Sequence, residues 1–277
     1  HSKTIPRPQF QEFLFIPQTG IQSSYKINKI ARKLAKGEMK KSGQKNISPN
    51  DENAWQNSYK SEEAIAMTSY IKNEVMKKYS VKLDLGIDVA ASSFFTNKKY
   101  RYNLEKEKIV LEREQQISYI ANIIKKYCLL YIEDPLEEND FSGFTKLRKI
   151  TGKNTLIVGD DLTVSSLERL KKAIKEKSIN GIIVKPNQNG SLLQIKQLIE
   201  LAKKHNIKTI LSHRSGETLD NTIADLAFAW QCDYIKTGIS GKERESKIKR
   251  LIEISKKLIS KSPCVYLGLK AEVCLGL

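Results

Sequence analysis

The chain has 277 residues, 40% of them hydrophobic and 29% charged, which suits one α/β domain large enough for a barrel. It shows no membrane-length apolar run, no signal peptide and no Cys-x-x-Cys pair among its four cysteines, so we expect a cytoplasmic protein with reduced thiols. The net charge of +17 is spread over most expected helices without an RNA-binding motif, which argues against specific nucleic-acid binding and favours an anionic substrate.

Seven short apolar runs flanked by turn-forming residues predict strands, and segments with helical periodicity lie between them. The first strand is followed by two expected helices, and from residue 113 onward helices and strands alternate. Ser165 and Glu168 predict a capping box at the start of one helix. The expected strands are 11–16, 83–88, 128–133, 155–159, 180–185, 208–213 and 233–236; the expected helices are 21–40, 61–79, 113–127, 141–150, 165–177, 190–205, 217–231 and 241–260.

Two segments do not fit this alternation. Residues 41–60 form a long polar loop, and loops of that length in compact domains are usually functional. The tail 263–277 is apolar without helical periodicity and leaves three interpretations open: an added strand, an oligomer contact or a non-native end. A closed eight-stranded barrel needs one strand more than the seven, so either the first strand is missing or another segment supplies it.

Chemically active side chains recur where the expected strands end. The successive intervals along the series Glu133, Asp160, Lys185, His213 and Lys236 are 27, 25, 28 and 23 residues. Each interval is about the length of a strand, a helix and two loops. TIM barrels build their active sites from groups at successive strand ends. The spacing therefore predicts a TIM-type barrel with its site at one rim, rather than polar residues that only mark strand ends.

Several motifs resemble the enolase family in order and spacing. The resemblance covers roughly residues 9–260 and implies the TIM-type (β/α) barrel of the enolase C-terminal domain. Against the family pattern, we expect the N-terminal capping domain and the first barrel strand to be absent here. The matching motifs are DVAAS (88–92), IEDP (132–135), GDDL (159–162), VKPNQNGSL (184–192), SHRSGET (212–218), IADLA (223–227) and IKTG (235–238).

The resemblance implies a magnesium site and a general base. Asp88, Glu133 and Asp160 match the family's ligands for Mg²⁺, a hard cation that prefers oxygen donors. Lys185 matches the base that removes a proton from C2 of 2-phosphoglycerate, a role that requires a neutral amine. The lysine-plus-Mg²⁺ pattern is a known one for this superfamily.

The resemblance also implies substrate-binding groups. Lys236 matches the lysine that contacts the substrate carboxylate, and Arg214 with Ser215 matches the phosphate-binding pair. His213 matches an active-site histidine. Glu12, in the QEF motif, matches an acid that assists departure of the C3 hydroxyl group.

Two departures from the family pattern concern the leaving group and the N-terminus. When SGQKNISPN (42–50) is aligned with the family's GDEGG loop on the shared Pro-Asn, Gln44 takes the position of a second glutamate. A glutamine cannot donate a carboxylic proton, so activity could be impaired, with Asp51 or Glu52 as possible substitutes. His1 could match an upstream active-site histidine.

The sequence thus predicts a Mg²⁺-dependent phosphopyruvate hydratase with a catalytic barrel at 1–262 and an unassigned tail at 263–277. We expect a small phosphorylated three-carbon acid as substrate, no membrane partner, and either a homodimer or a partner chain that supplies the capping domain. Two alternatives stay open: a weakly active or inactive enolase-like protein that binds a ligand or partner, and proton abstraction from another acid sugar.

Overall fold

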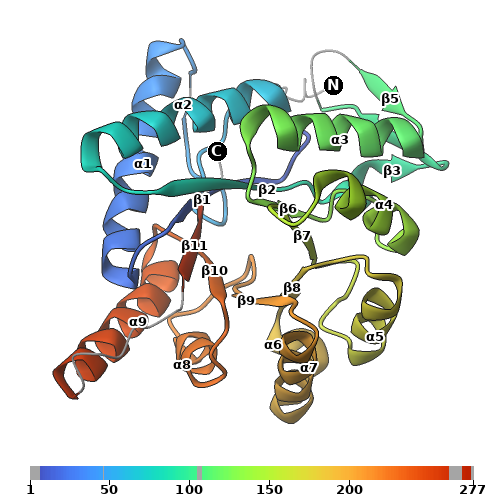
Figure 1. Ribbon diagram of the computed structural model, residues 1–277. Coiled ribbons are helices and arrows are strands. Elements are labelled where there is room, and N and C mark those ends of the chain that lie inside the picture. Colours follow the sequence, from blue (N-terminus) through green and yellow to red (C-terminus); the bar gives the residue numbers. More distant parts are fainter. Residues whose placement is uncertain (1–6, 46, 105–107, 262–269, 276–277) are drawn as a thin grey trace.

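The barrel is visible in the computed structural model, which describes residues 7–45, 47–104, 108–261 and 270–275 (Figure 1). In this part of the chain eight strands close into a barrel in the order β1-β11-β10-β9-β8-β7-β6-β2. The expected TIM-type barrel is therefore confirmed. The barrel strands are β1 (Glu12–Pro17), β2 (Leu83–Asp88), β6 (Tyr131–Glu133), β7 (Leu156–Gly159), β8 (Gly181–Val184), β9 (Lys208–Ser212), β10 (Tyr234–Gly238) and β11 (Lys270–Leu275).

One strand of the barrel runs against the others. β1 pairs antiparallel with both β2 and β11, whereas the remaining neighbours are parallel. Glu12 at the start of β1 therefore lies opposite Asp88 at the end of β2. This reversal brings the first residues of β1 to the rim where the parallel strands end.

The eighth strand comes from the apolar tail. β11 inserts between β10 and β1, parallel to β10 (Ile235 opposite Ala271) and antiparallel to β1 (Phe13 opposite Leu275). Of the three interpretations left open for the tail, the added strand is the one that the backbone supports. Residues 262–269, 276 and 277 lie outside the described residues, as does His1.

Helices cover the outside of the barrel, as the alternating pattern predicts. One apolar cluster lies between helices and strands, and a second, which includes Leu14, Tyr131 and Ile183, fills the interior of the barrel. No described helix is long and apolar enough to cross a membrane. The helices are α1 (Ile21–Lys41), α2 (Ser61–Tyr79), η1 (Ala91–Phe94), α3 (Arg113–Tyr127), α4 (Phe141–Thr151), α5 (Leu167–Glu176), α6 (Pro186–Asn189), α7 (Leu192–Lys204), α8 (Thr222–Ala229) and α9 (Lys242–Lys261).

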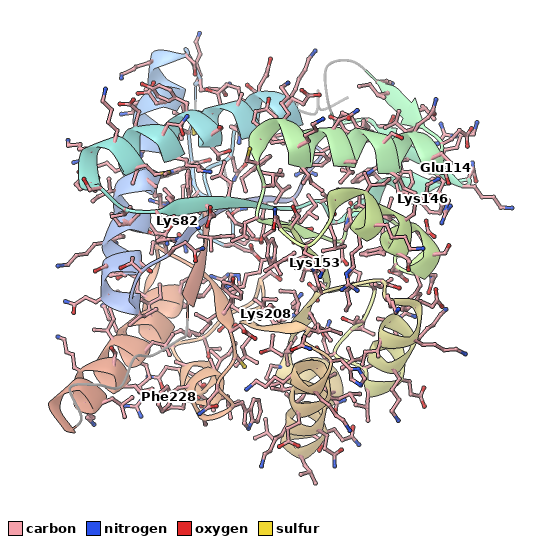
Figure 2. All side chains as sticks on the ribbon, in the orientation of Figure 1. Lys82, Glu114, Lys146, Lys153, Lys208 and Phe228 are labelled. Atoms are coloured by element: carbon pink, nitrogen blue, oxygen red, sulfur yellow. The ribbon has the colours of Figure 1, made fainter. Side chains whose placement is uncertain are left out.

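Charged side chains cover the outer surface of the helical layer (Figure 2). Glu114 on α3 and Lys146 on α4 form an ion pair there. Beside this layer, β3 (Phe95–Thr96), β4 (Lys99–Tyr102) and β5 (Ile109–Leu111) form a small antiparallel sheet between β2 and α3.

The expected capping box at Ser165 is wrong. Ser166 is the residue that caps α5, because its side chain accepts a hydrogen bond from the Arg169 N–H. Ser165 has a left-handed backbone (φ 51°) and a fully buried side chain that serves the neighbouring loop instead.

Candidate active site

The rim that receives the strand ends is lined with buried acids. Asp88 ends β2, Glu133 ends β6 and Asp160 follows β7 directly, and all three are buried. Glu12 reaches the same rim through the antiparallel β1 and is also buried. Buried carboxylates are costly unless they are paired, so their grouping requires compensating positive charge.

Lys236 supplies much of that charge. Its Nζ lies 2.9 Å from Glu12 Oε2, 3.0 Å from Asp88 Oδ2 and 2.8 Å from Glu133 Oε2, and its side chain is 5% exposed. The Tyr131 hydroxyl also donates a hydrogen bond to Glu133 Oε2. One ammonium group therefore holds three carboxylates from β1, β2 and β6 together.

The three carboxylates respond differently to this environment. Burial opposes ionisation of Glu12, but Lys236, a hydrogen bond from Glu52 and the surrounding charges hold its pKa below the usual range. Burial raises the pKa of Asp88 to about 6 despite Lys236, and burial with the neighbouring Asp88 raises the pKa of Glu133 well above its usual value. Asp88 and Glu133 thus lack sufficient positive charge, whereas Glu12 has enough to be ionised.

Lys185 is oriented by Asp160. Its Nζ makes an ion pair with Asp160 Oδ2, and its side chain is 17% exposed. Burial lowers the pKa of Lys185, but the charge of Asp160 outweighs burial and raises it. Asp134 fixes the loop after β7: its two carboxylate oxygens accept hydrogen bonds from the backbone N–H of Asp160 (3.0 Å) and of Asp161 (2.6 Å).

Ser165, which the sequence suggested only as a helix cap, positions the backbone of Lys185. Its Oγ accepts a hydrogen bond from the Lys185 N–H at 2.8 Å and donates one to Gln188 Oε1 at 2.7 Å. A hydroxyl can accept and donate at once, which suits it to join these two groups. The loop after β8 is therefore tied to the loop after β7.

The structure places Glu52, one of the two possible substitutes, beside Glu12, and it does not bring Gln44 there. Gln44 Oε1 accepts hydrogen bonds from the Ser58 backbone N–H at 3.1 Å and from the Ser58 hydroxyl at 2.8 Å, within its own loop. Glu52 instead forms a hydrogen bond with Glu12 and belongs to a cluster with Glu12 and His213 whose ligand atoms lie within 4.8 Å of one another.

The surroundings of Glu52 favour its protonated form. Burial raises its pKa to about 8, and the negative charge of Glu12 acts in the same direction. Two adjacent carboxylates avoid repulsion when one keeps its proton. Lys236 stabilises the ionised form of Glu12, so the shared proton resides on Glu52.

His213 is buried and neutral. Burial lowers its pKa to about 3, and the positive charges of Arg244, Lys236 and Lys185 also disfavour protonation. Arg244 Nη1 lies 2.6 Å from His213 Nδ1. Since an arginine can only donate, Nδ1 is the acceptor and the imidazole proton is on Nε2.

Arg244, on α9, was not singled out from the sequence, because it lies in a helix rich in basic residues. It is 1% exposed, and its guanidinium donates to the backbone carbonyls of Arg214 and Ser215. A Cβ at Gly238 would lie 3.1 Å from both the Arg244 side chain and the Glu52 carbonyl oxygen. The glycine of IKTG thus allows α9 and the loop of Glu52 to approach β10.

Arg214 and Ser215 lie at the open side of the rim, where both are exposed. Arg214 Nη1 donates to Asn187 Oδ1 at 3.0 Å, and its backbone N–H donates to Glu217 Oε1 at 2.9 Å. The guanidinium is therefore within reach of both the loop after β8 and solvent.

The acids of the rim fit a divalent cation. Glu133 Oε1 and Asp160 Oδ1 are buried and have no hydrogen-bond partner among the described residues. Asp134, Asp160 and Asp161 also bring ligand atoms within 4.8 Å of one another. Unpartnered carboxylate oxygens inside a protein are unfavourable, and a hard cation would satisfy them.

Fold and site together define a β/α-barrel protein with paired acids and lysines at the carboxyl ends of its strands. The family model described as the C-terminal TIM barrel domain of enolase matches residues 5–273. The chain belongs to this enolase family.

Curated relatives agree with this assignment. The enolase of Picrophilus torridus is 40% identical over 253 residues, which cover 90% of this chain and 62% of the relative. The enolase of Methanosphaera stadtmanae is 38% identical over 262 residues, covering 92% and 62%. That of Sulfurisphaera tokodaii is 46% identical over 197 residues, covering 70% and 45%. The chain thus spans about 62% of the length of the first two relatives.

Proposed function

We propose that the chain catalyses the Mg²⁺-dependent, reversible dehydration of 2-phospho-D-glycerate to phosphoenolpyruvate, an activity of glycolysis and gluconeogenesis. The observation that carries the proposal is the joint placement of a base candidate, Lys185, and an acid candidate, Glu52, at one rim that also holds the carboxylates. A dehydration of this kind needs a base for the C2 proton and an acid for the C3 hydroxyl group.

Asp88, Glu133 and Asp160 would hold the Mg²⁺, because their oxygens include the two buried atoms without a partner. When bound, the cation supplies positive charge that stabilises the negative charge developing on the substrate carboxylate. Asp160, which pairs with Lys185 in the present structure, raises the pKa of that lysine. Neutralising Asp160 would lower it and favour the free amine that a base requires.

The residues of the chain would then divide the reaction between them. Lys185 takes the proton from C2, the C2–C3 double bond forms, and the C3 hydroxyl leaves as water with the proton of Glu52. Glu12 keeps that proton on Glu52 until it is needed. Lys236 faces the substrate carboxylate, Arg214 and Ser215 face the phosphate, and His213 lines the site.

The alternative of a weakly active or inactive scaffold rested on Gln44, the missing capping domain and the unusual tail. Glu52 beside Glu12 supports turnover instead, since it offers the carboxylic proton that a glutamine lacks. A homodimer, a partner chain that contributes further structure, and a cytoplasmic location remain predictions, as does the division of the chain at residue 262.

The test is Mg²⁺-dependent formation of phosphoenolpyruvate from 2-phosphoglycerate by the purified chain. We expect turnover that Lys185→Ala abolishes and that chelation of Mg²⁺ abolishes. Turnover equal to the parent in Lys185→Ala would refute the assigned base. Binding of Mg²⁺ and substrate without turnover in the parent would refute the proposed reaction for this chain.

A further inference from the structure

A second concentration of positive charge lies outside the barrel, on α1. Four basic residues of α1 share one helix face, because each lies three or four residues from two of the others: Lys29, Arg32, Lys33 and Lys36. Like charges at these spacings repel one another. The sequence suggested lysines spread over many helices, but here they gather.

These four cations line a pocket of about 520 Å³ together with Ile30 and Trp55. The volume lies within the range of small-molecule sites. The walls combine mobile lysine ammonium groups with one fixed guanidinium and one aromatic ring.

Arg32 is held in place from two sides. Its Nη2 donates to the Asn53 carbonyl oxygen at 2.9 Å, and its Cζ lies 3.7 Å from the centroid of the Trp55 ring. The Trp55 indole N–H in turn donates to the Arg32 carbonyl oxygen at 3.1 Å. The guanidinium is thus preorganised, which reduces the entropy lost when a ligand binds.

The positive charge of the pocket is poorly neutralised. Arg32 Nε is buried and has no hydrogen-bond partner among the described residues. Lys29 pairs with Glu245 at 3.0 Å, but in the described part of the chain no carboxylate pairs with Lys33 or Lys36. Lys36 Nζ lies over the Trp55 ring, 4.3 Å from its centroid, a contact that brings no negatively charged group to the ammonium.

We propose that this pocket binds an anion with two adjacent phosphate groups, either free pyrophosphate or the diphosphate of an organic carrier. A guanidinium held in place and two lysines without carboxylates suit such oxygens, and the pocket of about 520 Å³ has room for two phosphate groups. The site is separate from the acid-lined rim, and the proposal does not depend on the reaction proposed above.

The chain contains two tryptophans, Trp55 and Trp230, so a Trp230→Phe protein carries a single fluorophore in the pocket. Titration of this protein with pyrophosphate, without divalent metal, is expected to change the Trp55 emission with saturation, because the anion draws the Lys36 ammonium from the ring while Arg32 stays stacked on it. Adenosine diphosphate in a parallel titration distinguishes the sources. Equal affinity assigns the contact to the diphosphate alone, and tighter binding assigns it to an organic carrier.

Matched variants test whether the pocket is specific. Lys33→Gln/Lys36→Gln is expected to weaken pyrophosphate binding at least tenfold. Lys26→Gln/Lys40→Gln removes the same charge from exposed positions of α1 outside the pocket and should change binding less than twofold. Equal weakening by both pairs, or no saturable change in emission, would overturn the proposal.

A last variant separates the pocket from the rim. Arg214→Gln, which alters the proposed phosphate-binding position at the rim, should leave the Trp55 titration unchanged. Loss of the titration in this variant would assign the signal to the rim and overturn the pocket.

Discussion

Replacing Lys236 with methionine removes the one ammonium that contacts Glu12, Asp88 and Glu133 at 2.8–3.0 Å. Removing one partner of a buried ion pair typically costs about 3–5 kcal/mol, because the opposite charge stays buried. Three carboxylates lose their partner here, so we expect a loss near the upper end, about 4–5 kcal/mol, in the free energy of unfolding.

Urea unfolding at neutral pH with chelator present measures this loss. Lys208→Met is the matched control: Lys208 Nζ lies 2.6 Å from Asp233 Oδ1, but its side chain is 52% exposed. Exposed pairs contribute about 0–1 kcal/mol, so this variant should be nearly as stable as the parent.

The pH dependence supplies the decisive comparison. The decrease in unfolding free energy caused by Lys236→Met should become smaller as the pH falls, because the carboxylates that Lys236 contacted take up protons and no longer carry buried charge. A loss no larger than that of Lys208→Met, or one that is unchanged at acid pH, would refute the central role given to Lys236.

Three further predictions concern other parts of the molecule. Glu52→Gln should lower the rate of phosphoenolpyruvate formation by about 10²–10⁴-fold, whereas Gln44→Glu should leave the rate within a factor of about two. A large gain in rate with Gln44→Glu would instead assign the position of the second acid to residue 44, as the alignment on Pro-Asn does. The pKa of His213 is lowered to about 3, so the contribution of neutral His213 to stability is full above about pH 6.5 and is lost as the pH falls toward 3. His213→Gln should therefore reduce the fall of unfolding free energy with decreasing pH, by up to about 1.4 kcal/mol per pH unit. Urea unfolding measured between pH 4 and 7 checks this. Deletion of 263–277 removes β11 from between β10 and β1 and so opens the barrel. The midpoint of thermal unfolding should fall by more than about 10 °C. An unchanged midpoint would show that β11 does not close the barrel.

The barrel could be predicted because its signals are local. Each strand is a short apolar run, and three of the rim acids, Asp88, Glu133 and Asp160, stand at the last position of such a run or just after it. Parallel strands in register bring their ends to one rim, so sequence order alone placed these side chains together. The eighth strand was harder to predict, because the sequence of an isolated apolar tail does not indicate which strands it will pair with.

Loop residues could not be placed from local signals. Glu52 lies in a long polar loop, and its approach to Glu12 depends on contacts distant in sequence, such as that between its carbonyl and Gly238. Arg244 shows the same limit, because a buried arginine on an amphipathic helix looks like any other basic residue of that helix. The neighbouring Asp51-Glu52 acid pair was a signal, but the Pro-Asn match outweighed it.

The charge pattern of the rim explains why its ligand acids and its acid–base residues behave differently. Lys236 lies nearest to Glu12, Asp88 and Glu133, yet only Glu12 has its pKa lowered, because Glu52 adds a hydrogen bond there. Asp88 and Glu133 retain raised pKa values, so adding a cation to them would be favourable, whereas adding one to the Glu12–Glu52 pair would displace a useful proton. The same set of acids would therefore suit the proposed proton donor on the β1 side and the proposed cation site on the β2–β6–β7 side.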